Sequence, residues 1–156
     1  MDQLTTSEIV HRKGIALNGY DVVAFFEKRQ AIRGSRTYSI KWKGLEWWFI
    51  NNQYRDLFTE NPEKYLPQFG GYCAFGVANG YKAPVKPAAF TIVENKLYFN
   101  FAKYIQKRWL ENMDQKIAEA EKRWSKVKST QPITANRILI WWKYRFLQLF
   151  GKDIFR

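Results

Sequence analysis

The 156-residue chain is poor in the residues that build disulfides and metal centres, because it contains one cysteine, Cys73, and one histidine, His11. A single cysteine cannot form an intrachain disulfide, so nothing in the sequence requires an oxidising compartment. A structural zinc site normally takes four Cys or His ligands, and two such residues cannot supply them. The sequence therefore excludes a disulfide framework and a closed zinc site.

Acidic residues are also scarce, since 14 Asp and Glu accompany 26 Lys and Arg and the formal net charge is +12. A basic protein attracts anions over a distance that salt shortens, so nucleic-acid phosphates and acidic lipid headgroups are both expected partners. The pair Gly70 and Gly71 is followed by neither the lysine nor the hydroxyl side chain of a P-loop. Nucleotide binding through such a loop therefore has no support.

Long hydrophobic runs are missing as well. Residues 1–13 are polar and have no apolar central region, so they do not form a secretory signal. Residues 138–150 are apolar but short and interrupted by charges, whereas a bilayer crossing takes about 20 predominantly apolar residues. We expect a cytoplasmic protein, with a peripheral position on the inner face of the membrane as one option, unless a leader precedes this numbering.

Aromatic residues, by contrast, make up 18% of the chain, and hydrophobic residues make up 46%. Such a composition favours folding over disorder, and the length suits one domain with a tail. The segment Ser129–Pro132 interrupts the helical pattern before it, and the residues after it are aromatic and basic. We therefore expect a polar arm over residues 1–13, a domain over 14–128 and a C-terminal tail over 129–156.

Alternating apolar residues predict two β-hairpins, one over residues 37–50 with its turn at Lys43-Gly44 and one over 89–100 with its turn at Glu94-Asn95. Short helices are expected to start at three places. Asp21 and either Asn51 or Asn52 suit an N-cap, and Asn61-Pro62 suits a first turn.

A long helix is expected over residues 101–128. Its apolar side chains step by three or four residues along one face, which is typical of a helix packed on a sheet. These residues are Ile105, Trp109, Met113, Ile117, Ala120, Trp124 and Val127. Together the expected elements predict an α+β fold.

Several ordered motifs make residues 14–126 resemble the YHS-domain family. They are Gly19-Tyr20-Asp21, Trp47-Trp48-Phe49, Asn61–Leu66, Gly70–Ala74 and Lys96–Asn100. The motif Gly-Gly-Tyr-Cys-Ala is similar to that of the stand-alone branch of the family. The resemblance implies a small α+β module of a kind mostly found in metal-handling and poorly characterised proteins, and it implies no reaction.

The chain departs from the metal-associated relatives at two positions. Those relatives often carry two cysteines on a strand-to-helix segment, and this chain has Ile50 and Tyr54 at the corresponding places. Neither side chain is a useful metal ligand. A metal site would have to be built from other residues.

Cys73 is the main candidate for chemistry, because glycines on both sides could hold its thiol in a fixed turn. Three interpretations remain: a buried packing residue, a weak Cu(I) or Zn(II) ligand assisted by His11 and Asp21, or a redox or nucleophilic thiol. Asp21 has the alternative role of a helix N-cap. A ligand pocket near Cys73 is expected to be lined by Tyr20, Asp21, Tyr72 and Phe75.

The tail over residues 133–150 is expected to form an amphipathic helix. Its contact residues for an anionic membrane surface would be Trp141, Trp142, Lys143, Arg145, Phe146 and Phe150, in a stripe that also includes Ile138. A tail folded back on the domain, or paired with a second copy in a homo-oligomer, is the alternative.

Three functions follow from these patterns. The first is a non-enzymatic YHS-like module that binds a small ligand or metal ion and is tethered to a membrane surface. The second is a basic nucleic-acid-binding protein, because cations and exposed aromatics form stacking grooves. The third is a thiol-dependent enzyme that uses Cys73, for which the sequence offers no identifiable base.

Overall fold

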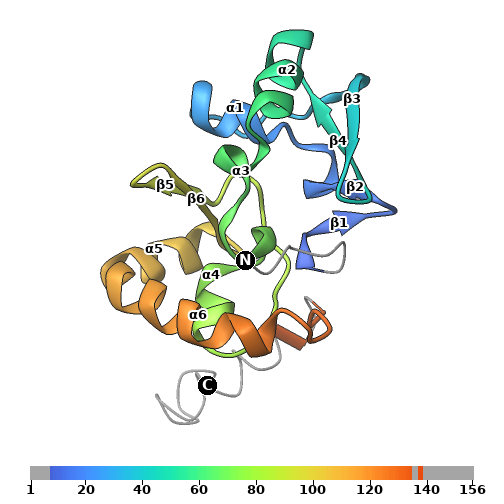
Figure 1. Ribbon diagram of the computed structural model, residues 1–156. Helices are drawn as coiled ribbons and strands as arrows, with labels where there is room; N and C mark the ends of the chain where they lie inside the picture. Colours follow the sequence, from blue (N-terminus) through green and yellow to red (C-terminus); the bar gives the residue numbers. More distant parts are fainter. Residues whose placement is uncertain (1–7, 135–136, 139–156) are drawn as a thin grey trace, which may run out of the picture.

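Pairs of strands alternate with helices along the chain in the computed structural model (Figure 1). The structure describes residues 8–134 and 137–138. The strands form a four-stranded sheet and a two-stranded sheet, and the helices pack against the sheets and one another. In Figure 1, α1, α2, β3 and β4 lie at the upper end, α3 lies near the middle, and α5 and α6 lie at the lower end. This arrangement confirms the expected α+β fold class.

The first expected hairpin consists of β3 (Ser35–Trp42) and β4 (Leu45–Phe49), which pair antiparallel. Lys43 and Gly44 form the turn with φ angles of 48° and 74°. Left-handed backbone at both positions matches the right-handed twist of the strands, which is why this two-residue turn joins them. The hairpin is confirmed at the predicted turn.

The second hairpin is confirmed in the same way. β5 (Phe90–Val93) and β6 (Lys96–Phe99) pair antiparallel, and they form a separate two-stranded sheet. Glu94 and Asn95 make the turn with φ angles of 49° and 59°.

A third, shorter hairpin completes the larger sheet and was not predicted. β1 (His11–Arg12) pairs antiparallel with β2 (Ile15–Ala16), and β2 pairs in parallel with β4, which gives the order β1-β2-β4-β3. The two-residue strands are too short for an alternating pattern to show in the sequence.

The expected polar arm is therefore wrong for residues 8–13, which belong to the folded domain. Ile9 is fully buried, and the amide of Val10 donates to the carbonyl of Gly70 at 2.8 Å. A Cβ atom on Gly70 would lie 1.6 Å from the carbonyl oxygen of Glu8, and Gly70 has φ +63°. Only glycine allows the N-terminal segment to cross the chain at this point.

Short helices begin where the cap signals predicted them. α1 (Val22–Glu27) follows Asp21, α2 (Asn52–Glu60) follows Asn51, and α3 (Pro62–Tyr65) has proline in its first turn. Proline is tolerated there because the first amides of a helix have no intrahelical acceptor.

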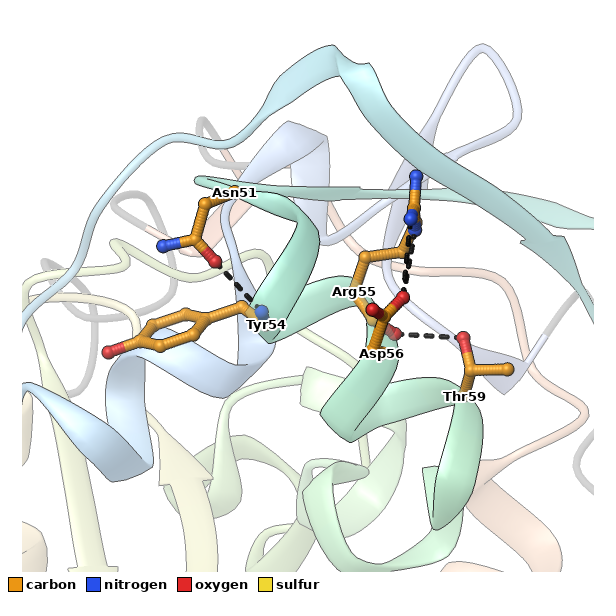
Figure 2. Close-up of polar contacts among 5 residues, drawn as sticks. All are labelled: Asn51, Tyr54, Arg55, Asp56 and Thr59. Carbon is orange, nitrogen blue, oxygen red and sulfur yellow. Dashed lines mark hydrogen bonds and ion pairs between the residues drawn. The ribbon is translucent and has the colours of Figure 1, made fainter.

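Side chains at the start of α2 and on its exposed side form local hydrogen bonds and an ion pair (Figure 2). The Oδ1 atom of Asn51 accepts a hydrogen bond from the amide of Tyr54 at 2.8 Å. One turn later, the hydroxyl of Thr59 donates to the carbonyl of Arg55 at 2.8 Å, and Arg55 pairs with Asp56 at 3.2 Å. These contacts fix the helix that follows β4.

The single long helix expected over residues 101–128 is instead two helices, α5 (Lys103–Glu111) and α6 (Met113–Val127). Asn112 separates them with φ −140° and ψ 49°. A straight helix of the predicted length would run about 40 Å, which is longer than a small domain is wide. The break allows Trp109 and Ala120, which are fully buried, to pack on the same core from different helix axes.

Two further segments surround the cysteine motif. The 3-10 segment η3 (Gln68–Gly71) and the short helix α4 (Ala74–Ala78) lie on either side of Cys73, and α4 packs along α6. The sequence predicted a tight turn here and missed α4, because five residues are too few to reveal a helical period. The segment Leu17–Gly19 forms a further 3-10 turn, η2.

The start of the tail packs on the domain. Ile138 is 2% exposed and lies in a small apolar cluster with Cys73, Ala83 and Ile105, and the amide of Ile133 donates to the carbonyl of Lys82 at 2.9 Å. The expected membrane contact is wrong for Ile138. The other expected membrane-contact residues lie outside the described residues: Trp141, Trp142, Lys143, Arg145, Phe146 and Phe150.

Candidate ligand-binding site

Cys73 is buried in the smaller of two apolar clusters, and its chain neighbours Tyr72 and Ala74 belong to the larger one. Its side chain is 2% exposed, its thiol lies 3.6 Å from the Oδ1 atom of Asn100, and its sulfur accepts a hydrogen bond from the amide of Phe101 at 3.3 Å. Burial raises the pKa of the thiol to about 11, although backbone hydrogen bonds from Gly76, Phe101 and Phe75 oppose the shift. The thiol is therefore protonated at neutral pH and joins two segments of backbone.

Asp21 is fully buried, and both of its oxygens are occupied by backbone amides. Oδ1 accepts from Val23 at 2.8 Å and from Ala24 at 3.1 Å, and Oδ2 accepts from Ile50 at 2.7 Å. Burial raises the pKa of the carboxyl above its ordinary value, and the three backbone hydrogen bonds partly oppose that rise. The carboxyl thus caps α1, as the sequence predicted, and ties α1 to the end of β4.

The residues proposed for a metal centre are not gathered into one. His11 is exposed on β1 at the edge of the sheet, whereas Cys73 and Asp21 are buried and bonded as described above. Within residues 8–134 and 137–138, no group of three or more His, Cys, Asp or Glu side chains is placed to hold an ion. The structure therefore offers no preformed centre for Cu or Zn in the part of the chain that it describes.

Tyr72 and Phe75 lie on either side of the cysteine, and neither lines any of the four best-formed pockets of the described residues. Tyr72 is buried with the Nζ atom of Lys82 at 4.9 Å from its ring centre, and burial raises the pKa of its hydroxyl. Phe75 lies under the Nζ atom of Lys116 at 5.6 Å. The expected residues therefore do not gather into one pocket, and the side chains of Tyr72 and Cys73 are buried.

Asn100 and Lys82 are buried polar residues that the sequence did not single out. The Oδ1 atom of Asn100 also accepts from the amide of Phe75 at 3.4 Å, while its Nδ2 atom has no hydrogen-bond partner among the described residues. Burial lowers the pKa of Lys82, and the nearby carboxylate of Glu8 opposes that shift. These groups hold the cysteine turn between the N-terminal segment and the start of α5.

A different place on the molecule has the properties of a ligand site. It is a pocket of about 350 Å³ between the turn of the β1-β2 hairpin, η2, β4 and the loop before β5. We call it the cationic pocket and define it by its lining residues, Arg12, Lys13, Ile15, Asn18, Tyr20, Arg33, Trp48 and Pro87.

The three cations of this pocket, Arg12, Lys13 and Arg33, have no carboxylate partner among the described residues. None of the residues that line the pocket is acidic. Like charges that line one pocket repel one another, and an anion bound in the pocket would relieve that repulsion.

Two of these cations differ in how they are held, because Arg33 has side-chain contacts and Lys13 is exposed. Lys13 lies in the β1-β2 turn with φ 51°, where the side chain projects from a two-residue loop. Arg33 donates to the carbonyl of Asn18 at 3.2 Å and places its guanidinium 5.1 Å from the ring centre of Tyr20. The guanidinium of Arg33 is therefore held in a defined position by Asn18 and Tyr20.

Trp48 supplies the aromatic wall of the pocket. It is half-buried on the face of β4 opposite Trp47 and Phe49, which enter the core. The indole Nε1 donates to the carboxylate of Glu46 at 2.8 Å, and Glu46 in turn pairs with Arg36 at 3.3 Å. These bonds orient the indole ring.

Gly19 allows the aromatic wall and the cation to approach the same stretch of backbone. A Cβ atom at this position would lie 2.9 Å from the ring of Trp48 and 3.3 Å from the guanidinium of Arg33, and the backbone φ is +86°. A larger residue would displace one of the two side chains. In the Gly19-Tyr20-Asp21 motif, Gly19 thus contacts Trp48 and Arg33, and Asp21 caps α1.

Of the predicted site residues, only Tyr20 lines the cationic pocket. The sequence missed Arg12, Lys13, Arg33 and Trp48, which come from three separate segments. The one available signal was Trp48, because alternation on β4 places this large ring on the face away from the core.

Two other hollows fit a small charged ligand less well. One, of about 310 Å³, is lined by Asn79, Tyr81, Ile133, Arg137 and Ile138 and has a single cation. The other, of about 340 Å³, includes the like-charged pair Glu63 and Glu121 beside Trp124. Neither combines several cations with an aromatic wall.

Comparisons with family models, curated proteins and solved structures found no match to this chain. Within the described residues, the helices are too short or too polar for any of them to cross a bilayer.

Proposed function

We propose that the protein is a non-enzymatic binding module that takes up a small anionic ligand in the cationic pocket. The observation that carries this proposal is the set of three cations, Arg12, Lys13 and Arg33, in the lining of one pocket that contains no carboxylate. A ligand carboxylate or phosphate would supply the missing counter-charge. The net charge of +12 would speed its approach at low salt.

The size of the pocket supports a small molecule. Its volume of about 350 Å³ lies near the lower end of the range of about 300–1,000 Å³ that is usual for ligand sites. Arg33 suits a carboxylate or phosphate because its planar guanidinium can donate two parallel hydrogen bonds. Lys13 and Arg12 would add charge at the rim.

A thiol enzyme has weaker support. The thiolate is the reactive form of cysteine, and burial raises the pKa of Cys73 to about 11. Its sulfur is already engaged with the amide of Phe101 and with Asn100. Moving a substrate to this atom would require opening the core.

Calorimetric titration with pyrophosphate tests the proposal directly. We expect Lys13→Gln/Arg33→Gln to weaken binding by more than about tenfold, because each charge-assisted hydrogen bond is worth about 1.5–3 kcal/mol. The matched control is Lys96→Gln/Arg123→Gln, which removes the same charge from residues that do not line the pocket. An equal loss in both double variants would reduce the effect to net charge and contradict the proposal.

Nucleic-acid binding is the competing outcome of the same experiment. A single-stranded 20-nucleotide DNA should bind weakly and with a steep salt dependence if only net charge attracts it. Tight DNA binding by wild type together with undetectable pyrophosphate binding would replace the small-ligand proposal.

The resemblance to YHS-like modules and the basic aromatic tail extend the proposal. We propose that the module is held at an anionic membrane surface through residues 141–150, which would place it peripherally in the cytoplasm. The sequence pattern of this stretch supports the idea.

The full-length variant Trp141→Ser/Trp142→Ser keeps Ile138 in its apolar cluster, so it tests the tail without opening the domain. Wild type and the variant are each sedimented with anionic and with neutral vesicles. We expect the variant to lose binding to the anionic vesicles only. Equal sedimentation of both proteins would leave the tail as a packing or oligomerisation segment.

A further inference from the structure

We infer that the ligand carries a planar aromatic ring beside its negative charge, and that Trp48 is the surface on which this ring stacks. The inference rests on the proposed function, since it names the chemical class of the ligand that the cationic pocket would hold. It predicts preference for ring-bearing anions over anions of similar charge without a ring.

The first observation concerns the contacts of the Trp48 side chain. The indole N–H is satisfied by Glu46 at 2.8 Å, so the polar edge of the ring has its partner within the protein. Within the described part of the chain, Trp48 makes no ring-ring or cation-π contact. A half-buried tryptophan whose polar atom is satisfied presents mainly apolar ring surface to the pocket.

The second observation is the contrast with the neighbouring aromatic residue. The ring of Tyr20 already has the guanidinium of Arg33 at 5.1 Å from its centre. Trp48 lines the same pocket and has no cation over its ring, although the Cε3 edge of the ring packs against Gly19. A ligand ring that enters the pocket can therefore stack on the part of the indole that is still exposed.

The third observation is the closeness of ring and charge. The ring of Trp48 and the guanidinium of Arg33 lie 2.9 Å and 3.3 Å from the same point, the position that a Cβ atom of Gly19 would take. A ligand ring lying on the indole would bring an attached phosphate or carboxylate within reach of Arg33. The arrangement favours one ring with an anionic group close to it.

The strand pattern indicates that Trp48 is not required by the core. Leu45, Trp47 and Phe49 form the buried face of β4, and Trp48 lies on the opposite face. Glu46, beside it on that face, is held by Arg36 at 3.3 Å. This chain of contacts orients a surface ring, which is a requirement for a stacking site.

The test compares three probes, AMP, ribose 5-phosphate and adenosine, by calorimetry on the full-length protein. We expect AMP to bind at least about fivefold more tightly than ribose 5-phosphate, which is the low end of the gain from stacking one base on an aromatic side chain. Adenosine, which lacks the anion, should bind more weakly than AMP. Trp48→Leu should remove the preference for AMP over ribose 5-phosphate, whereas Trp48→Phe should keep part of that preference.

A second readout does not depend on the leucine variant folding. The indole N–H signal of Trp48 in a ¹H–¹⁵N correlation spectrum, assigned by its disappearance in Trp48→Phe, should shift on addition of AMP and shift less with ribose 5-phosphate. Equal affinity for AMP and ribose 5-phosphate, with no distinct shift of this signal, would overturn the stacking inference and leave the proposed anion site standing. Failure of AMP, ribose 5-phosphate and pyrophosphate to bind would overturn both.

Discussion

Replacement of Asp21 gives the sharpest test of the structural account, because this one carboxyl joins three backbone amides. The change Asp21→Ala removes the acceptor for Val23 and Ala24 at the start of α1 and for Ile50 at the end of β4. The site is fully buried, so water cannot replace the lost acceptor without opening the structure.

The expected magnitude follows from these contacts. Loss of an N-cap costs about 0.5–2 kcal/mol. Leaving the part-buried amide of Ile50 without an acceptor adds about 1–3 kcal/mol. We therefore expect the free energy of unfolding of Asp21→Ala to fall by about 2–4 kcal/mol. Asp21→Asn keeps one oxygen for the cap but turns an NH₂ group toward Ile50, so it should lose less.

The pH dependence has a defined sign. Burial raises the pKa of Asp21 above its ordinary value of 3.8, so the folded state holds this proton more tightly than the unfolded state does. The stability of wild type relative to Asp21→Asn should therefore be greatest below about pH 3.8 and should decline as pH rises through the folded-state pKa. The asparagine variant removes this one titration and leaves the others in place.

Urea unfolding of wild type, Asp21→Ala and Asp21→Asn between pH 3.5 and 7, followed by tryptophan fluorescence, measures both quantities. A loss below about 0.5 kcal/mol in Asp21→Ala would refute the buried network. A stability difference that grows with pH would show that the three hydrogen bonds outweigh the effect of burial on the carboxyl.

Three further predictions concern the core and the backbone. Trp109→Ala should lower the free energy of unfolding by about 3–5 kcal/mol, since this ring is fully buried, and a loss near zero in chemical denaturation would contradict its placement. The thiol of Cys73, whose pKa is about 11, should react with DTNB at pH 8 on the order of 100-fold more slowly in native protein than in 6 M guanidinium, and comparable rates would show an accessible thiolate. Gly34→Ala should lower the free energy of unfolding by more than about 1 kcal/mol, because its Cβ would lie 2.5 Å from the backbone of Trp48. Gly14 has φ +79° and open space around it, so Gly14→Ala should show only the smaller cost of backbone strain. Equal thermal shifts for these two variants would contradict the close packing at Gly34.

Local signals in the sequence determined much of the fold. Asp21 and Asn51 cap helices where they were expected, because a cap depends on a side chain and amides two or three residues away. The turns at Lys43-Gly44 and Glu94-Asn95 likewise follow from backbone preferences within two residues. The α+β class could therefore be predicted from short stretches of chain.

The tertiary structure decided whatever depends on residues far apart in the sequence. The break at Asn112 arises because Trp109 and Ala120 must both reach one core, and no local signal marked it. The same is true of Ile9, whose segment is held by contacts around Gly70.

The candidate site illustrates the same limit. The sequence directed attention to Cys73, because its glycine neighbours are visible in one short motif, and the fold buries that thiol in the core. The cationic pocket draws Arg12, Arg33 and Trp48 from β1, from the segment before β3 and from β4. Their proximity is a consequence of the parallel pairing of β2 with β4 and of the close approach over Gly19. Spacing along the chain carries no information about such contacts, so only the folded structure could bring the cations and the indole ring together.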